Sequence, residues 1–201
     1  MIVTLINDKI NIKIGDFNCT FSNPEIVEML SNGRLSEKKV SYKLFIDNRE
    51  LQLLCPMLKK ATCENTVLWP SFKLPYRKYP VYIYLYSVAL YLSKKMSMRE
   101  VAVHVKNKFG LDKFSHSTIS RTLKKLSSIV DSIMDILPFN DQVITDLSPD
   151  PSVRKSWDNE SKEKYSTLLS ILLPVLDKER INEYSSLLNY KYFKKYKKFI
   201  I

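Results

Sequence analysis

Residues 97–126, SMREVAVHVKNKFGLDKFSHSTISRTLKKL, contain two short amphipathic segments separated by a turn with a glycine. In the first segment apolar residues recur with the i, i+3, i+4, i+7 spacing of one helix face, at Met98, Val101, Ala102, Val105 and Phe109. Gly110 predicts that this helix ends at about Phe109, because glycine readily adopts the left-handed conformation that closes a helix. The pattern therefore predicts a helix followed by a turn.

The second segment predicts a helix that begins after Ser115, which is a suitable N-cap residue. Its apolar residues recur with helical spacing and predict a buried stripe, made of Ile119, Leu123, Leu126 and Val130. At about 100° per residue, the opposite face holds hydroxyl and basic side chains and no acid: Ser117, Arg121, Lys124 and Ser128, with Thr118 and Lys125 beside them. Two helices joined in this way are typical of a helix-turn-helix that binds DNA.

In such a unit the N-terminal part of the second helix enters the major groove, where hydroxyl and guanidinium groups reach base edges. The predicted base-reading residues are His116, Ser117, Thr118 and Arg121. The predicted phosphate contacts are Lys124 and Lys125, and Arg99 and Lys113 complete the DNA-binding set. An ordinary helical hairpin with a solvated basic face is the alternative, since the connector is longer than the usual three or four residues.

Basic side chains outnumber acidic ones, with 32 Lys and Arg against 21 Asp and Glu and a net charge of +11. The excess is concentrated in residues 90–137 and 187–201, each with a net charge of +5, whereas residues 138–186 carry −3. Such a distribution favours association with nucleic acid, and also with anionic membranes. Composition alone does not decide between them, because abundant Lys, Asn, Ile and Tyr are also typical of an AT-rich genome.

We expect an α+β fold that is mostly α, in three parts. Residues 1–79 are predicted to form a small β-rich region that ends in an extended, proline-containing connector. Residues 80–137 are predicted to form a trihelical helix-turn-helix domain, and residues 138–201 an acidic linker, helices and a basic tail.

Individual elements are predicted from alternating patterns, caps and prolines. The expected strands span residues 2–6, 10–14, 40–46 and 51–55. The expected helices span residues 24–30, 81–95, 98–109, 116–137, 159–173 and 178–192, the fourth ending at Pro138.

Residues 63–102 resemble the junction between a zinc ribbon and a helix-turn-helix in certain bacterial transposase-associated proteins. The matching residues are Cys63, Pro70, Ser71, Phe72, Pro75, Tyr76, Tyr79, Ser97, Arg99, Val101 and Ala102. This resemblance covers 40 of the 201 residues, about a fifth of the chain. It implies a DNA-binding protein of mobile-element origin, with a degenerate, ribbon-like N-terminal region.

A zinc ribbon needs four Cys or His ligands, usually in two C-x2-4-C knuckles. The cysteines here are Cys19, Cys55 and Cys63, and no two of them have that spacing. A site completed by His104 or His116 is conceivable, but these histidines belong to the predicted helices. We therefore expect no metal, and cysteines that act as small buried apolar residues.

The acidic residues after Pro138 are the candidates for two-metal phosphodiester chemistry: Asp141, Asp146, Asp150, Asp158 and Glu160. They lie in a segment broken by prolines that lacks the strands needed to bring carboxylates together. We interpret them as linker charges and as charges at a helix N-terminus. The sequence also contains no phosphate-binding loop, zinc-protease motif or nucleophile elbow, so we expect no catalytic residues and no cofactor.

The tail, residues 187–201, alternates aromatic side chains with five lysines: Lys191, Lys194, Lys195, Lys197 and Lys198. This interleaving suits auxiliary contact with nucleic acid or with an anionic membrane surface. If the tail is helical, Leu188, Tyr192, Lys195 and Phe199 share a stripe, and a docked terminal helix with outward lysines is at least equally consistent with the sequence.

The N-terminal residues lack the features of a signal peptide, and the longest apolar run, residues 81–92, is shorter than the about 20 residues needed to span a bilayer. We expect a cytoplasmic protein that binds double-stranded DNA and no small molecule, as a homodimer if its site is symmetric. The alternative is an interaction or architectural module whose basic face binds an acidic protein or a membrane surface.

Overall fold

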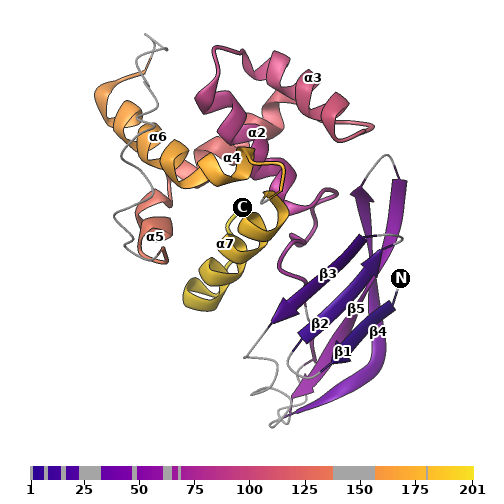
Figure 1. Ribbon diagram of the computed structural model, residues 1–201. Coiled ribbons are helices and arrows are strands. Elements are labelled where there is room, and N and C mark those ends of the chain that lie inside the picture. Colours follow the sequence, from indigo (N-terminus) through magenta and orange to yellow (C-terminus); the bar gives the residue numbers. More distant parts are fainter. Residues whose placement is uncertain are drawn as a thin grey trace.

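The computed structural model describes residues 2–6, 9–14, 17–22, 33–46, 49–60, 65–67, 69–137, 157–179 and 181–201. Before residue 69 it describes side chains only at Ser41, Lys43, Phe45, Cys55, Met57 and Val67. The helices gather in one part of the molecule and the strands in another (Figure 1). From residue 69 onward the described chain is mostly helical, which confirms the expected predominance of α structure.

The strands form two antiparallel three-stranded sheets with the orders β1-β2-β3 and β4-β5-β6. Their bounds are β1 Ile2–Ile6, β2 Lys9–Ile14, β3 Phe17–Ser22, β4 Gly33–Ile46, β5 Arg49–Lys60 and β6 Asn65–Val67. The four expected strands lie within β1, β2, β4 and β5, whereas β3 and β6 were not predicted. The helix expected at residues 24–30 lies outside the described residues.

Helix α2 (Val81–Ser93) is the centre of the helical part (Figure 1). Every residue from Val81 to Tyr91 is buried, because the segment is apolar on all sides and a helix of that kind must be surrounded by protein. It contacts α3 (Met98–Lys108) and α4 (His116–Ser127), and it also contacts helices from the C-terminal part of the chain.

The predicted bounds of α3 and α4 agree with the structure at three of their four ends. The prediction that the helix beginning at residue 116 continues to Pro138 is wrong. Helix α4 ends at Ser127, and a separate short helix, α5 (Val130–Met134), follows. Ser127 and Ser128 donate their hydroxyls to backbone carbonyls of the preceding turn, and Ile129 leaves the helical conformation. Serines that bond to the backbone in this way compete with helix continuation.

The C-terminal part consists of α6 (Asn159–Leu172), the 3-10 turn η2 (Leu173–Leu176) and α7 (Ile181–Tyr196). Helix α7 therefore begins three residues later and ends four residues later than expected. Side chains of α6, η2 and α7 lie in the same hydrophobic core as those of α2, α3 and α4. The described helices on both sides of the expected boundary at residues 137 and 138 thus share one core.

Candidate nucleic-acid interface

Helix α3 begins with a reciprocal capping box. The Glu100 backbone N–H donates to Ser97 Oγ (3.2 Å), and the Ser97 backbone N–H donates to Glu100 Oε2 (2.7 Å). These hydrogen bonds, the one from the Ser97 backbone first, hold the pKa of the Glu100 carboxyl below its usual value. The only acid of α3 is therefore engaged in starting the helix.

The turn after α3 has a Schellman geometry. Gly110 adopts a φ of 58°, and the Leu111 N–H donates to the Lys106 carbonyl (2.9 Å). Leu111 is buried beneath this turn, which fixes the direction in which the chain leaves the helix. The glycine and the apolar residue after it together aim the chain toward α4.

Asp112 fastens the α3–α4 connector to the segment that precedes α2. It accepts from Lys78 Nζ (2.7 Å) and from the Tyr79 hydroxyl (2.9 Å), and the Lys113 carbonyl lies beside the same hydroxyl. The hydrogen bonds from Lys78 and then Tyr79 lower the pKa of the Asp112 carboxyl to about 2. Burial and then the hydrogen bond with Asp112 raise the pKa of Tyr79. The start of α4 is thereby held by a charged clamp.

Ser115 is the N-cap residue of α4, as the sequence predicts, but its hydroxyl does not bond to the backbone. Its Oγ lies 2.8 Å from Ser117 Oγ and 3.1 Å from Thr118 Oγ1. His116 and Ser117 are exposed and Thr118 is half-buried. The first turn of α4 thus presents a group of hydroxyls and an imidazole at a helix N-terminus, where backbone N–H groups favour an anionic partner.

The remainder of the exposed face of α4 is basic. Arg121, Lys124 and Lys125 are all exposed, and Arg121 Nε donates to the Ser117 carbonyl one turn earlier (3.2 Å). Helix α4 contains no acidic residue. The opposite face is buried through Ile119, Thr122, Leu123 and Leu126, three of which the sequence predicts. The structure therefore brings the predicted base-reading and phosphate-binding residues of α4 onto the solvent side of one helix.

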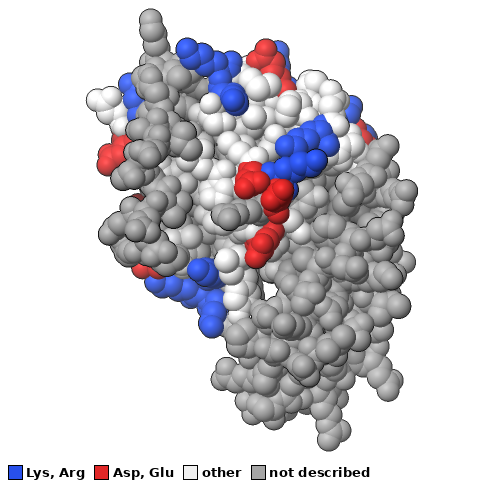
Figure 2. Space-filling view, viewed as in Figure 1, with Lys and Arg blue, Asp and Glu red and all other residues white. Residues whose placement is uncertain are grey.

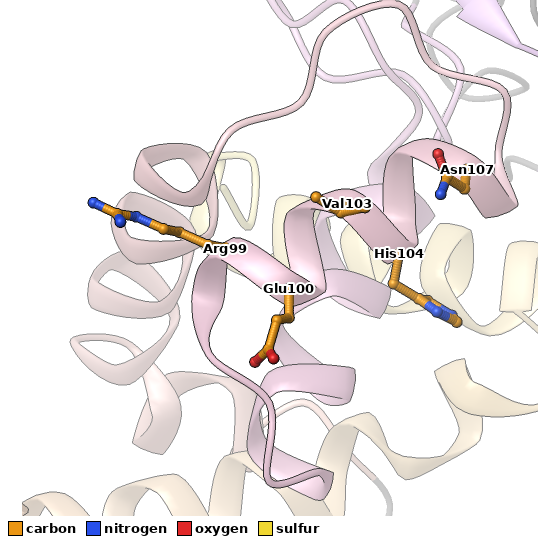
Figure 3. A pocket seen from close by; sticks show the side chains of 5 residues that line it. All are labelled: Arg99, Glu100, Val103, His104 and Asn107. Atoms are coloured by element: carbon orange, nitrogen blue, oxygen red, sulfur yellow. The ribbon is translucent and has the colours of Figure 1, made fainter.

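Arg99 and Lys113 are exposed but lie on different elements. Arg99, Glu100, Val103, His104 and Asn107 line a hollow of about 430 Å³ on the outer side of α3. Figure 3 shows that these side chains leave the helix in different directions rather than converging. His104 Nε2 lies 3.5 Å from the Tyr86 hydroxyl at the edge of the core. The hollow therefore lacks the converging polar groups of a small-molecule site.

The C-terminal tail is a docked helix. Lys195 Nζ pairs with Asp135 Oδ2, to which the Tyr196 hydroxyl also donates (2.6 Å). Tyr192 and Ile200 are buried, Lys191 is half-buried, and Lys194, Lys197 and Lys198 are exposed. Of the stripe predicted for a helical tail, Leu188 and Tyr192 are buried, Lys195 is exposed, and Phe199 is half-buried beyond the end of α7.

Lysines and arginines form separate groups on the face shown in Figure 2, and acidic side chains lie between some of them. This face has no continuous basic surface over the helical part. The features that favour a nucleic-acid interface are therefore the exposed hydroxyl and basic side chains of α4 rather than a basic surface on the face shown.

The residues considered for metal or catalytic chemistry have structural roles where they are described. Burial raises the pKa of the Cys55 thiol to about 12, Asp158 caps α6 by accepting from the Ser161 N–H (2.7 Å), and Glu160 pairs with Lys164 (2.6 Å). Within the described ranges, no group of three or more His, Cys, Asp or Glu could hold a metal ion. Lying outside the described residues are Cys63, Asp141, Asp146 and Asp150, and also the Cys19 side chain.

Two features of residues 69–80 were not anticipated. Lys73 is 1% exposed and donates to the Leu74 carbonyl (3.1 Å) and to the Arg77 carbonyl, and burial lowers its pKa to about 8. Tyr76 is 97% exposed, with a φ of 58°. The Leu-Pro-Tyr-Arg sequence indicates a turn, but neither the burial of a lysine nor a left-handed tyrosine has a sequence signal.

The residues that carry the transposase resemblance occupy two places in the structure. Those from Pro70 to Tyr79 form the packed connector before α2, and those from Ser97 to Ala102 form the cap and first turn of α3. Among the described helices none is long and apolar enough to cross a membrane. No known family model, curated protein or solved structure matches this chain.

Proposed function

We propose that this chain is a non-catalytic helix-turn-helix protein that binds double-stranded DNA, with α4 in the major groove. One observation carries the proposal. Helices α2, α3 and α4 pack against one another, and α4 turns outward a face that holds hydroxyls, an imidazole, an arginine and lysines without any acid. A recognition helix needs this combination of donors and positive charge.

In this proposal the first turn of α4 reads base edges. His116, Ser117 and Thr118 lie nearest the groove floor, and Arg121 follows one turn later on the same side. Arginine is suited to guanine, because its guanidinium donates two parallel hydrogen bonds to O6 and N7. The hydrogen bond from Arg121 Nε to the Ser117 carbonyl restricts the side chain before DNA arrives.

Lys124 and Lys125 would contact phosphates farther along the groove, and Lys113 would do so beside the start of α4. Arg99, at the start of α3, would contact the backbone where that helix crosses it. The resemblance to transposase-associated proteins makes a mobile-element origin part of the proposal. A two-fold symmetric target would require a homodimer.

The test is selection of the purified protein on a library of randomised DNA duplexes, at low and at physiological salt. We expect one sequence motif to be enriched at both salt concentrations. Arg121→Ala should lower affinity for that motif by about ten- to a hundredfold and relax preference at one base pair. Lys124→Ala, on the same face one turn later, should weaken all duplexes about equally and reduce the salt slope by about one.

Retention that disappears with salt and enriches no sequence would contradict the proposal. In that case the basic face of α4 would serve an acidic protein or an anionic membrane, and vesicles with anionic lipids would be the next probe. A normal motif in Arg121→Ala would instead contradict base reading by α4.

A further inference from the structure

The connector before α2 contains a tight turn with an unusual residue at its tip. The Arg77 N–H donates to the Leu74 carbonyl (3.3 Å), with Pro75 second and Tyr76 third in the four-residue turn. The φ of 58° at Tyr76 is positive, as a type II turn requires at its third position, where the ordinary value is about 80°. Glycine or asparagine normally occupies that place, because a side chain in the left-handed region is crowded.

Packing within the protein does not explain the tyrosine. Its side chain is 97% exposed, so it contributes almost no burial to the fold. A bulky residue held in a costly conformation while its side chain stands in solvent is a feature that concentrates at binding sites. The surrounding structure must therefore hold this conformation in place.

The turn is held from several sides. The buried Lys73 ammonium donates to the carbonyls of its first and last residues, Leu74 and Arg77. On either side of the turn, the Phe45 N–H of β4 donates to the Lys78 carbonyl (3.0 Å), and the Val81 N–H donates to the Phe72 carbonyl (2.8 Å). The tip is thus presented by a rigid base.

The same segment lies against the start of the proposed recognition helix. The rings of Tyr79 and Phe114 have centroids 5.9 Å apart, and Lys78 pairs with Asp112 in the α3–α4 connector. Tyr76 precedes Tyr79 by three positions, so their Cα atoms lie within about 11 Å of each other. The turn that carries the exposed phenol is therefore joined by a short stretch of chain to the residues that contact the connector before α4.

The charge around the turn suits a polyanion. Residues 69–81 contain no acid; of their basic residues, Lys73 is buried and Lys78 is paired with Asp112, and the half-buried Arg77 lies next to the tip in sequence. The nearest carboxylate described above, that of Asp112, is already paired with Lys78. A neutral hydroxyl within a positively charged segment can donate to a phosphate oxygen without repulsion.

We propose that the Tyr76 hydroxyl donates to a DNA phosphate just outside the base pairs read by α4, so that the turn acts as a second, rigid contact with the duplex. This inference rests on the proposed function and names a part of the DNA surface that α4 alone does not reach.

Binding of Tyr76→Phe and Tyr76→Gly to the duplex selected by the wild-type protein tests the inference. Tyr76→Phe keeps the ring and removes only the hydroxyl, and it should bind about tenfold more weakly, because hydrogen bonds to charged groups are worth about that much. The salt slope should stay that of the wild type, because a neutral group releases no counterion. In a phosphate-ethylation interference experiment, ethylation of one phosphate should weaken binding of the wild-type protein and leave binding of Tyr76→Phe unchanged.

Tyr76→Gly separates a contact role from a structural one. It should bind as weakly as Tyr76→Phe while its thermal midpoint rises by about 2–4 °C, since glycine relieves the left-handed strain. Loss of binding together with a lower midpoint would overturn the inference, because a disturbed turn would then explain the loss. Wild-type affinity in Tyr76→Phe would also overturn it while leaving the proposed function intact, whereas a wild-type protein that enriches no sequence would overturn both.

Discussion

At the scale of single residues, Asp112 links two segments that are far apart in the chain. One carboxylate joins the segment before α2 to the connector before α4, through an ammonium and a phenol from adjacent residues, Lys78 and Tyr79. Such clamps hold one arrangement of two elements that burial alone would not specify.

The Asp112 clamp predicts a pH dependence of stability. The folded-state pKa of about 2 lies below the ordinary value of about 3.9, so the stabilisation is fully present above the ordinary value and is lost as pH falls through about 2. We expect the thermal midpoint of Asp112→Asn to lie below that of the wild type at pH 6. The two midpoints should converge as the pH approaches 2, because the wild type then loses the stabilisation by the Asp112 carboxylate. Lys78→Met should reproduce most of this effect, because the Lys78 hydrogen bond is the largest cause of the shift. A difference that stays constant from pH 6 to 2 would argue against the clamp.

At the scale of elements, the two serines before α3 and α4 look equivalent in sequence and differ in structure. Ser97 completes a capping box with Glu100, a pairing that the Ser-x-x-Glu spacing indicates. Ser115 occupies the same position before α4 but bonds to neighbouring hydroxyls. The three-residue spacing places Thr118 where a reciprocal cap needs a Glu or Gln.

The two caps predict unequal costs. Ser97→Ala should lower the free energy of unfolding by about 1 kcal/mol, because it leaves the Glu100 N–H without its side-chain acceptor. Ser115→Ala, the matched variant, should cost clearly less, because no backbone N–H loses a partner. Urea denaturation of both variants measures the difference, and equal losses would show that the capping box does not stabilise α3.

At the scale of the whole molecule, α2 joins the proposed DNA-binding helices to the C-terminal helices in one core. Asn189 on α7 adds a polar link: Nδ2 donates to the Ser71 carbonyl (2.7 Å) and Oδ1 accepts from the Ile200 N–H (3.1 Å). Asn189 is 1% exposed, so if its side chain were replaced by an apolar one, the Ser71 carbonyl and the Ile200 N–H would have no water to replace the lost hydrogen bonds.

This arrangement predicts that α7 stabilises the core that it shares with α2, α3 and α4. Asn189→Leu, of similar size, should lower the free energy of unfolding by about 3 kcal/mol, because two buried backbone groups lose their partner. Leu187→Asn on the exposed side of the same helix should change it by less than about 0.5 kcal/mol. In urea denaturation, circular dichroism and tryptophan fluorescence should report one common unfolding transition, since the helices share a core. Separate transitions would mean that the two parts fold independently.

The sequence specified the helices whose boundaries have local chemistry. The serine before α4, the glycine after α3 and the proline in η2 each marked an end or a break. It failed at the end of α4, because apolar spacing continues through Val130 while the hydroxyls of Ser127 and Ser128 turn to the backbone. It also failed to show that Lys73 is buried, since lysine is normally exposed and here its ammonium is satisfied by the carbonyls of Leu74 and Arg77.

The sequence by itself determined the mostly helical character of the described residues from 69 onward, the buried and exposed faces of α3 and α4, and the set of side chains proposed to meet DNA. These follow from periodicity and capping, which act within a few residues. Only the tertiary structure decided that the tail docks through Tyr192 and Ile200, that α2 contacts both groups of helices, and that the segment before α2 contacts the connector before α4. Those outcomes depend on contacts between residues far apart in the chain, and a local pattern does not contain them.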